Sequence, residues 1–367
     1  MSLLDEEQSE APPSKHLEDI PSGPASPPSE SPPQPMVIDS GGDLVLRVGA
    51  EADEREQEYV VCSNTLRRSS PVWKSMLYGG FKEAKPAEGS WVVSLPDDQA
   101  DPMLVILNII HTRFILVPRQ PPLSEIYHIL TLAHKYDMTE IVQPWADCWM
   151  EVADNAQEKE DGCSLAMLTY VAWEMGNEDL FTTMINKLLL GSSVDDQGRL
   201  TTPDGICLEN YDYLGPPDLL EMISEFRKTD LIQPILDVVH ALIKDLLGFQ
   251  VCCKKESQKC DYSILGSVWY GMTKFRGSVM PESADEILES VTDLASSVSQ
   301  VSSYMSCLDN HPKCNPREKI DKIIRKTVRQ RKVILGPSHI EYMRKQRHKT
   351  GIAGPYVWDP CWAKGDE

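Results

Sequence analysis

The sequence predicts an α+β domain, a short sheet with a helical cluster, followed by an all-helical domain and preceded by a disordered tail. Three observations predict this class. Apolar residues alternate along three short segments between residues 44 and 95, recur at helical spacing from about residue 103 onward, and are scarce in the first 42 residues, where prolines are frequent. Because the strands precede the helices instead of alternating with them, α+β is favoured over α/β.

The N-terminal tail is predicted over residues 1–42, which hold nine of the 27 prolines and few large apolar side chains. Such a segment cannot bury enough apolar surface to offset the entropy lost on ordering. Up to Glu58 the chain carries 14 acidic residues against Lys15, Arg47 and Arg55, a net charge of −11 out of −20 for the whole chain. The remainder is therefore closer to neutral.

The first folded element is a β-hairpin. In segments 44–48 and 59–61 the apolar side chains fall on one face, with a long acidic tip between them. Two short helices follow. Ser63 is placed to cap the first, and Ser70 with Pro71 starts the second, because proline is tolerated at the first helical position. Residues 91–95 then form a third strand.

Helices dominate the rest of the chain. The α+β domain, residues 43–153, is expected to end with three helical stretches near residues 103–110, 123–133 and 139–152. A helical domain over residues 161–335 follows, and residues 336–367 are expected to form a basic and then irregular tail. The candidate helices of the helical domain are 163–175, 178–190, 217–228, 230–247, 261–275, 284–305 and 317–335.

Composition excludes several function classes. No apolar run approaches the ~18 residues of a membrane span, and the acidic start, MSLLDEEQSE, lacks the basic and apolar regions of a secretory signal. We therefore expect an intracellular protein, in the cytoplasm or the nucleus, whose ten cysteines are mostly reduced. The net charge of −20 argues against a nucleic-acid partner or an anionic membrane surface for the chain as a whole.

One stretch of the chain is strongly basic, although the chain as a whole is acidic. From Lys313 to Lys349 there are 13 Lys or Arg residues against Glu318, Asp321 and Glu341, a net charge of +10. Isoleucines at helical spacing favour a helix that docks its apolar face on the core and leaves a solvated basic face. The alternatives are a nuclear-import signal at residues 329–332 or 344–347, contact with the acidic tail, and contact with nucleic acid.

Residues 43–153 resemble a BTB/POZ domain. The similarity lies in the order of the elements and in residues that fit the family's usual pattern. These are Leu66, Ser70, Pro71, Val72, Trp73, Met76 and Leu77, then Ala133-His134-Lys135-Tyr136. Cys62 stands where this family usually has His. Ser63 stands where BTB transcription repressors carry a basic residue, so a repressor-type ligand is not expected. The segment before Asp43 shows no sign of the extra helix or strand that dimeric members exchange.

The rest of the chain resembles a group of BTB proteins of filamentous fungi. The motifs that carry this resemblance are Ala172-Trp173-Glu174-Met175-Gly176-Asn177, Leu180-Phe181, Cys260-Asp261, Gly266-Ser267 and His311-x-x-Cys314. The resemblance implies a non-enzymatic protein-interaction scaffold whose partners are other proteins, among them a second BTB chain.

A short motif points to one class of partner. Phe81-Lys82-Glu83 looks like the hydrophobic-x-Glu motif with which some BTB domains dock a cullin scaffold, and this implies a ubiquitin-ligase adaptor. Physically, an apolar anchor would fill a pocket with a carboxylate at its rim. The alternative is a solvent-facing loop in which the pattern arises by chance.

The Cys/His residues of the helical domain form the sharpest chemical pattern. Cys253 and Cys260 from one segment, with His311 and Cys314 from another, would fill a tetrahedral zinc site. Cys252 lies beside the first pair and Cys307 near the second. The alternative is that these side chains are buried thiols and a loop histidine that only pack together.

No sequence motif indicates catalysis. The phosphate-binding, dinucleotide-binding, nucleophile-elbow, H-E-x-x-H and C-x-x-C patterns are all missing from the sequence. We therefore expect a protein that is not an enzyme and that needs no cofactor beyond a structural zinc ion. A nuclear regulator that reads its targets through the basic helix is the remaining alternative.

Overall fold

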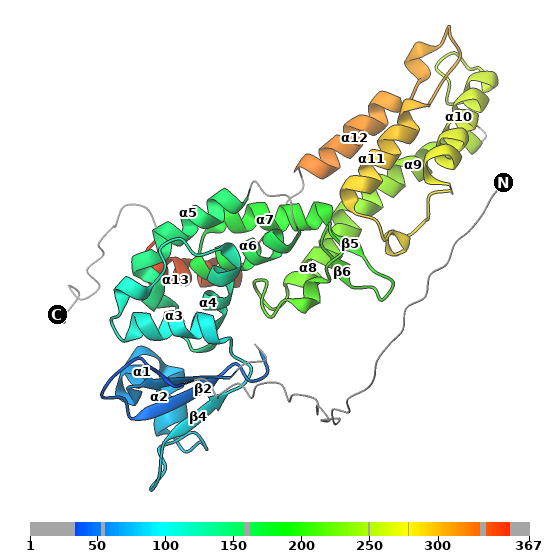
Figure 1. The fold of residues 1–367 in the computed structure, drawn as a ribbon. Coiled ribbons are helices and arrows are strands. Elements are labelled where there is room, and N and C mark those ends of the chain that lie inside the picture. Colours follow the sequence, from blue (N-terminus) through cyan, green and yellow to red (C-terminus); the bar gives the residue numbers. More distant parts are fainter. Residues whose placement is uncertain are drawn as a thin grey trace, which may run out of the picture. The chain divides into compact units, whose positions relative to one another are not determined.

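The computed structural model of the protein describes residues 34–52, 56–157, 162–248, 250–277, 279–330 and 335–352. The described residues from Pro35 to Ile352 belong to one compact unit. It combines a small sheet with many helices, so the predicted α+β class is confirmed (Figure 1).

The sheet contains four strands in the order β1-β3-β2-β4. β2 (Leu44–Val48) and β3 (Gln57–Val61) form the predicted antiparallel hairpin, and β4 (Val92–Leu95) pairs parallel with β2. The side chains predicted to share one face are all buried, namely Leu44, Leu46, Val48, Tyr59, Val61, Val93 and Leu95. The alternating pattern therefore identified the core face of the sheet.

Two short helices, α1 (Ser63–Ser69) and α2 (Pro71–Tyr78), connect β3 to β4. Ser70 caps α2 as predicted, because its hydroxyl accepts a hydrogen bond from the Trp73 backbone N–H at 3.0 Å. The prediction for Ser63 was wrong. It is the first residue of α1, and its hydroxyl instead donates to Asp43 at 2.9 Å.

Three helical segments complete the α+β part: α3 (Ala100–Ile110), α4 (Leu123–Lys135) and α5 (Ala146–Ala156). The predicted stretch 139–152 is divided, because residues Thr139–Trp145 form a 3-10 helix that contains Pro144. A proline inside a helix removes one backbone donor and clashes with the preceding turn. Trp73 of α2 stacks on Tyr136 after α4, with ring centroids 4.4 Å apart.

The helical part follows most of the predicted segments, but the prediction of an all-helical domain was wrong, because this part also contains a two-stranded sheet. The helix predicted over 284–305 begins only at Val291. The helices of this part are α6 (Gly162–Met175), α7 (Glu178–Gly191), α8 (Leu219–Phe226), α9 (Gln233–Leu247), α10 (Gln258–Arg276), α11 (Val291–Ser303) and α12 (Arg317–Gln330). A π-helical turn, Arg227–Ile232, joins α8 to α9, and β5 (Ser193–Val194) pairs with β6 (Leu200–Thr201). The buried apolar residues of both parts form one continuous core.

Both predicted tails extend too far into the fold. β1 (Met36–Val37) pairs in parallel with β3 and Ile38 is buried, so residues 36–38 do not belong to a disordered tail. The segment before Asp43 therefore does contain a short strand. At the other end α13 (Pro337–Thr350) is a helix rather than a tail. Residues 1–33 and 353–367 lie outside the described residues.

The helix α13 packs directly against the backbone of Gly176, which follows α6. Gly176 has a φ of +76°, and a Cβ there would lie 2.3 Å from the backbone nitrogen of Arg347. This contact combines a left-handed backbone conformation with a close approach that leaves no room for a side chain.

Gly176→Ala should therefore destabilise the protein by more than the cost of placing an alanine in a left-handed backbone conformation. Gly277→Ala is the matched control, because Gly277 has a φ of +70° and open space around its Cβ position. We expect about 1 kcal/mol of destabilisation for Gly277→Ala and at least about twice that for Gly176→Ala, measured by denaturant unfolding. Equal losses in the two variants would contradict the packing of α13 on Gly176.

Candidate metal centre

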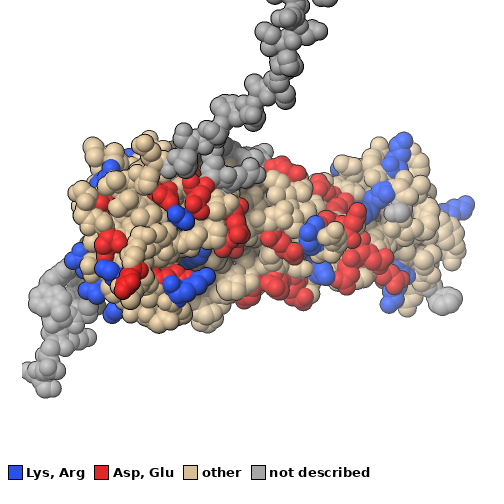
Figure 2. Space-filling view, turned by 60° about the horizontal axis from the view of Figure 1, so that its bottom comes forward, with Lys and Arg blue, Asp and Glu red and all other residues tan. Residues whose placement is uncertain are grey.

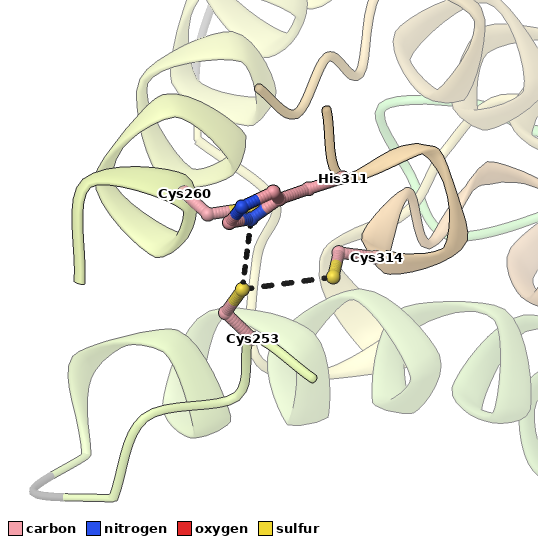
Figure 3. Close-up of side chains that lie close together, drawn as sticks. All are labelled: Cys253, Cys260, His311 and Cys314. Atoms are coloured by element: carbon pink, nitrogen blue, oxygen red, sulfur yellow. Dashed lines mark hydrogen bonds between the residues drawn. The ribbon is translucent and has the colours of Figure 1, made fainter. Parts of the chain in front are cut away.

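Two connections in the helical part bring four metal-ligand side chains together (Figure 3). Cys253 lies in the loop between α9 and α10, and Cys260 lies in the first turn of α10. His311 and Cys314 come from the connection between α11 and α12, where Pro312–Cys314 form a 3-10 turn. About 50 residues separate the two halves of this set, so only the packing of α10 against α11 makes them neighbours.

The four ligand atoms all lie within 4.8 Å of one another. The Sγ of Cys253 is 3.1 Å from Nδ1 of His311 and 3.7 Å from Sγ of Cys314. Cys253, Cys260 and His311 are buried, and Cys314 is partly buried. The structure therefore brings together all four residues that the sequence singled out.

The donor set and its spacing fit a zinc ion. Four ligands at a Zn–S distance of ~2.3 Å in a tetrahedron place neighbouring sulfur atoms roughly 3.8 Å apart, close to the 3.7 Å between Cys253 and Cys314. The same distance is far longer than the ~2.05 Å of a disulfide bond. Three thiols and one imidazole are also the soft and borderline donors that zinc prefers.

Backbone donors prepare one of the thiols for this role. Burial opposes ionisation of Cys253, but backbone N–H groups of Lys255 and Ser257 and the neighbouring thiols lower the pKa of Cys253 to about 6. Burial raises the pKa of Cys260 to about 11, and the negative charge on Cys253 adds to this effect. Cys253 therefore ionises more readily than Cys260, and the thiolate is the form that binds a metal ion.

Two neighbouring cysteines point away from the cluster. The Cys252 thiol is exposed and donates to the carbonyl oxygen of Asp245 at 3.2 Å, while its backbone N–H donates to Asp261. The Cys307 thiol donates to the carbonyl oxygen of His311 at 3.1 Å. Each of them lies beside a ligand in sequence or space without taking part in the cluster.

The predicted docking motif lies on the surface after α2. Phe81 is 59% exposed and Lys82 is almost fully exposed, whereas the Glu83 side chain is largely covered and lies 3.7 Å from the Lys82 ammonium. The Glu83 carbonyl accepts a hydrogen bond from the Trp91 indole at 2.8 Å, which holds this loop on the sheet. The loop thus presents one apolar side chain to solvent.

The basic helix α12 docks its apolar face, as predicted. Ile320 and Ile324 are buried, while Lys322, Arg325 and Lys326 are exposed. On the face drawn in Figure 2, groups of Asp and Glu interrupt the Lys and Arg side chains. That face therefore has no continuous basic surface of the kind that binds the phosphate backbone of a nucleic acid. The predicted import string 329–332 lies partly outside the described residues.

A buried carboxylate was missed by sequence reasoning. Glu174 of α6 is fully buried and accepts hydrogen bonds from Thr139, Tyr342 and Gln346, those from Thr139 and Tyr342 at 2.5 and 2.7 Å. Nδ1 of His134 also lies 3.3 Å from its Oε2. These contacts tie α13 to α4 and α6. The available signal was a single acidic residue within an otherwise apolar helix.

Neither a scan of protein-family models nor a search of curated proteins finds a match for this chain. Among the described helices, none has the length and apolar character required to cross a membrane.

Proposed function

We propose that the protein is a non-enzymatic interaction scaffold, with a BTB-like domain at residues 43–153 as docking platform and a zinc-stabilised helical part. The observation that supports the BTB-like docking platform is the order of its elements. A β-hairpin comes first, followed by the α1–α2 pair, a third strand parallel to the first strand of the hairpin, and a helical cluster. This is the order that the motif resemblance implies, and such domains act by binding other polypeptides.

The composition of the Cys/His cluster supports a structural role for zinc at Cys253, Cys260, His311 and Cys314. Catalytic zinc sites keep one coordination position for water or substrate, whereas structural sites fill all four with protein ligands. Three thiols and one imidazole within 4.8 Å supply four ligands. The centre would therefore clamp two loops, and it gives no support to an enzyme.

Co-purification from the native cell tests the scaffold function. The full-length chain should recover one or more proteins in near-stoichiometric amounts, identified by mass spectrometry. An unrelated tagged protein from the same cells is the control. Recovery no greater than this control would contradict the proposal.

A cullin-type ubiquitin-ligase adaptor is the more specific alternative, and the exposure of Phe81 favours it. Truncating a central apolar anchor typically costs 2 kcal/mol or more. Phe81→Ala combined with Glu83→Ala should therefore reduce cullin recovery by about tenfold or more. Lys82→Ala is the matched control, because this side chain is 92% exposed. Equal recovery from the double variant and the unchanged chain would exclude the adaptor.

A nuclear regulator is the second alternative, favoured by the exposed basic face of α12. Its signature would be binding to nucleic acid that weakens steeply with salt.

A further inference from the structure

An apolar ridge stands on the surface of the α+β part, in the 3-10 turn after α3. Its three consecutive side chains, Phe114, Ile115 and Leu116, are 54%, 94% and 51% exposed. Beside it, a pocket of about 230 Å³ is lined by Phe114, Arg119, Pro144, Trp145 and Cys148. Single exposed apolar residues are ordinary, but a contiguous group of this kind marks a binding surface.

The described chain ends against the 3-10 helix Thr139–Trp145, which supplies two residues of this pocket. A Cβ at Gly351 would lie 2.8 Å from Nε2 of Gln143, and Gln143 immediately precedes Pro144 and Trp145 of the pocket. Fifteen residues, 353–367, follow Ile352. At ~3.3 Å per extended residue, the six residues from Ile352 to Trp358 reach roughly 20 Å, about twice the diameter of a helix.

The chemistry of these last residues matches the ridge and its pocket. The sequence Pro-Tyr-Val-Trp-Asp-Pro-Cys-Trp at 355–362 supplies four large apolar side chains within seven residues. Asp359, in the middle of them, complements the exposed Arg119 at the rim of the pocket. The two prolines restrict the free segment and so reduce the entropy lost on docking.

We propose that residues 356–362 of this chain dock intramolecularly on the Phe114–Leu116 ridge, with an aromatic side chain in the pocket beside Trp145. A segment tethered this close has an effective concentration on the order of millimolar, which exceeds the concentration of a second copy of the chain. Another protein that uses the ridge must therefore displace the segment. This site is separate from the Phe81 loop.

Photocrosslinking in the full-length chain tests the proposal. Ile115→p-benzoyl-phenylalanine keeps a large apolar side chain at a position that is 94% exposed, and Leu247 of α9, 68% exposed, is the control position for the same substitution. After irradiation and trypsin digestion, the probe at 115 should join the peptide of residues 350–364, and the cross-linked protein should keep the mass of one chain. The probe at 247 should not yield this adduct.

A second variant links the adduct to the aromatic side chains. Adding Trp358→Ala should reduce its yield at least fivefold, whereas Asp366→Ala, in the same segment but outside the docking residues, should leave it unchanged. An adduct with the mass of two chains would assign the ridge to self-association. That result, or an irradiated protein without an adduct to residues 350–364, would overturn the proposal.

Discussion

Purified without added metal, the full-length chain should contain close to one zinc ion per molecule. Cys253→Ser should lower the zinc content severalfold, because three remaining ligands leave the tetrahedron incomplete. Cys252→Ser is a closely matched control, since the adjacent thiol points to the Asp245 carbonyl and not into the cluster. Elemental analysis measures both. Zinc below a tenth of an equivalent in the unchanged chain would exclude the metal centre.

Removal of the zinc should also loosen α9 to α12. Structural zinc in isolated zinc-finger peptides binds with about 10–16 kcal/mol of apparent free energy, and that energy is coupled to folding. Here the ion would hold the loop with Cys253 to the loop with His311, so a chelator should lower the melting temperature and speed hydrogen exchange in α10 and the residue 304–316 connection. The sheet should exchange at an unchanged rate.

Replacement of the buried Glu174 should release α13. Glu174→Ala would remove the acceptor for Tyr342 and Gln346, and the Gln346 amide would lose its partner inside the protein. A buried donor left without an acceptor typically costs about 1–3 kcal/mol. Denaturant unfolding should show this loss, and hydrogen exchange should place it in α13. Glu341→Ala is the control, because its pairs on the surface of α13 contribute about 0–1 kcal/mol.

The same network should make stability depend on pH. The hydrogen bond with Glu174 raises the pKa of His134 above its ordinary value, although burial opposes the shift. A raised folded-state pKa means that the protonated form is stabilising, so this contribution is complete below about pH 6.5. It is lost as the pH rises through the folded-state value. His134→Ala should remove this part of the pH dependence of α13 exchange, and an unchanged profile would contradict the role of His134.

Local pattern was enough to predict most elements. Alternation identified β2, β3 and β4, and helical spacing located the helices from α3 to α12, because each element needs one apolar face for the core. The errors lie where that signal is weak. β1 has two residues and depends on β3 for its hydrogen bonds, and Ser63 is held by Asp43, twenty residues away. The polar composition of α13 hid the three buried residues that anchor it, Met343, Gln346 and Thr350.

The fold class, the core faces and the four candidate zinc ligands could be predicted from residue type and short-range spacing, because both are written directly in the chain. The packing of the helices was needed to show that the Cys253 thiol lies 3.1 Å from the His311 imidazole, and that Glu174 joins residues 35 positions before it and 172 positions after it. Both contacts have the same cause. Side-chain partners far apart in the chain become neighbours only when helices pack, and short-range patterns do not record that packing.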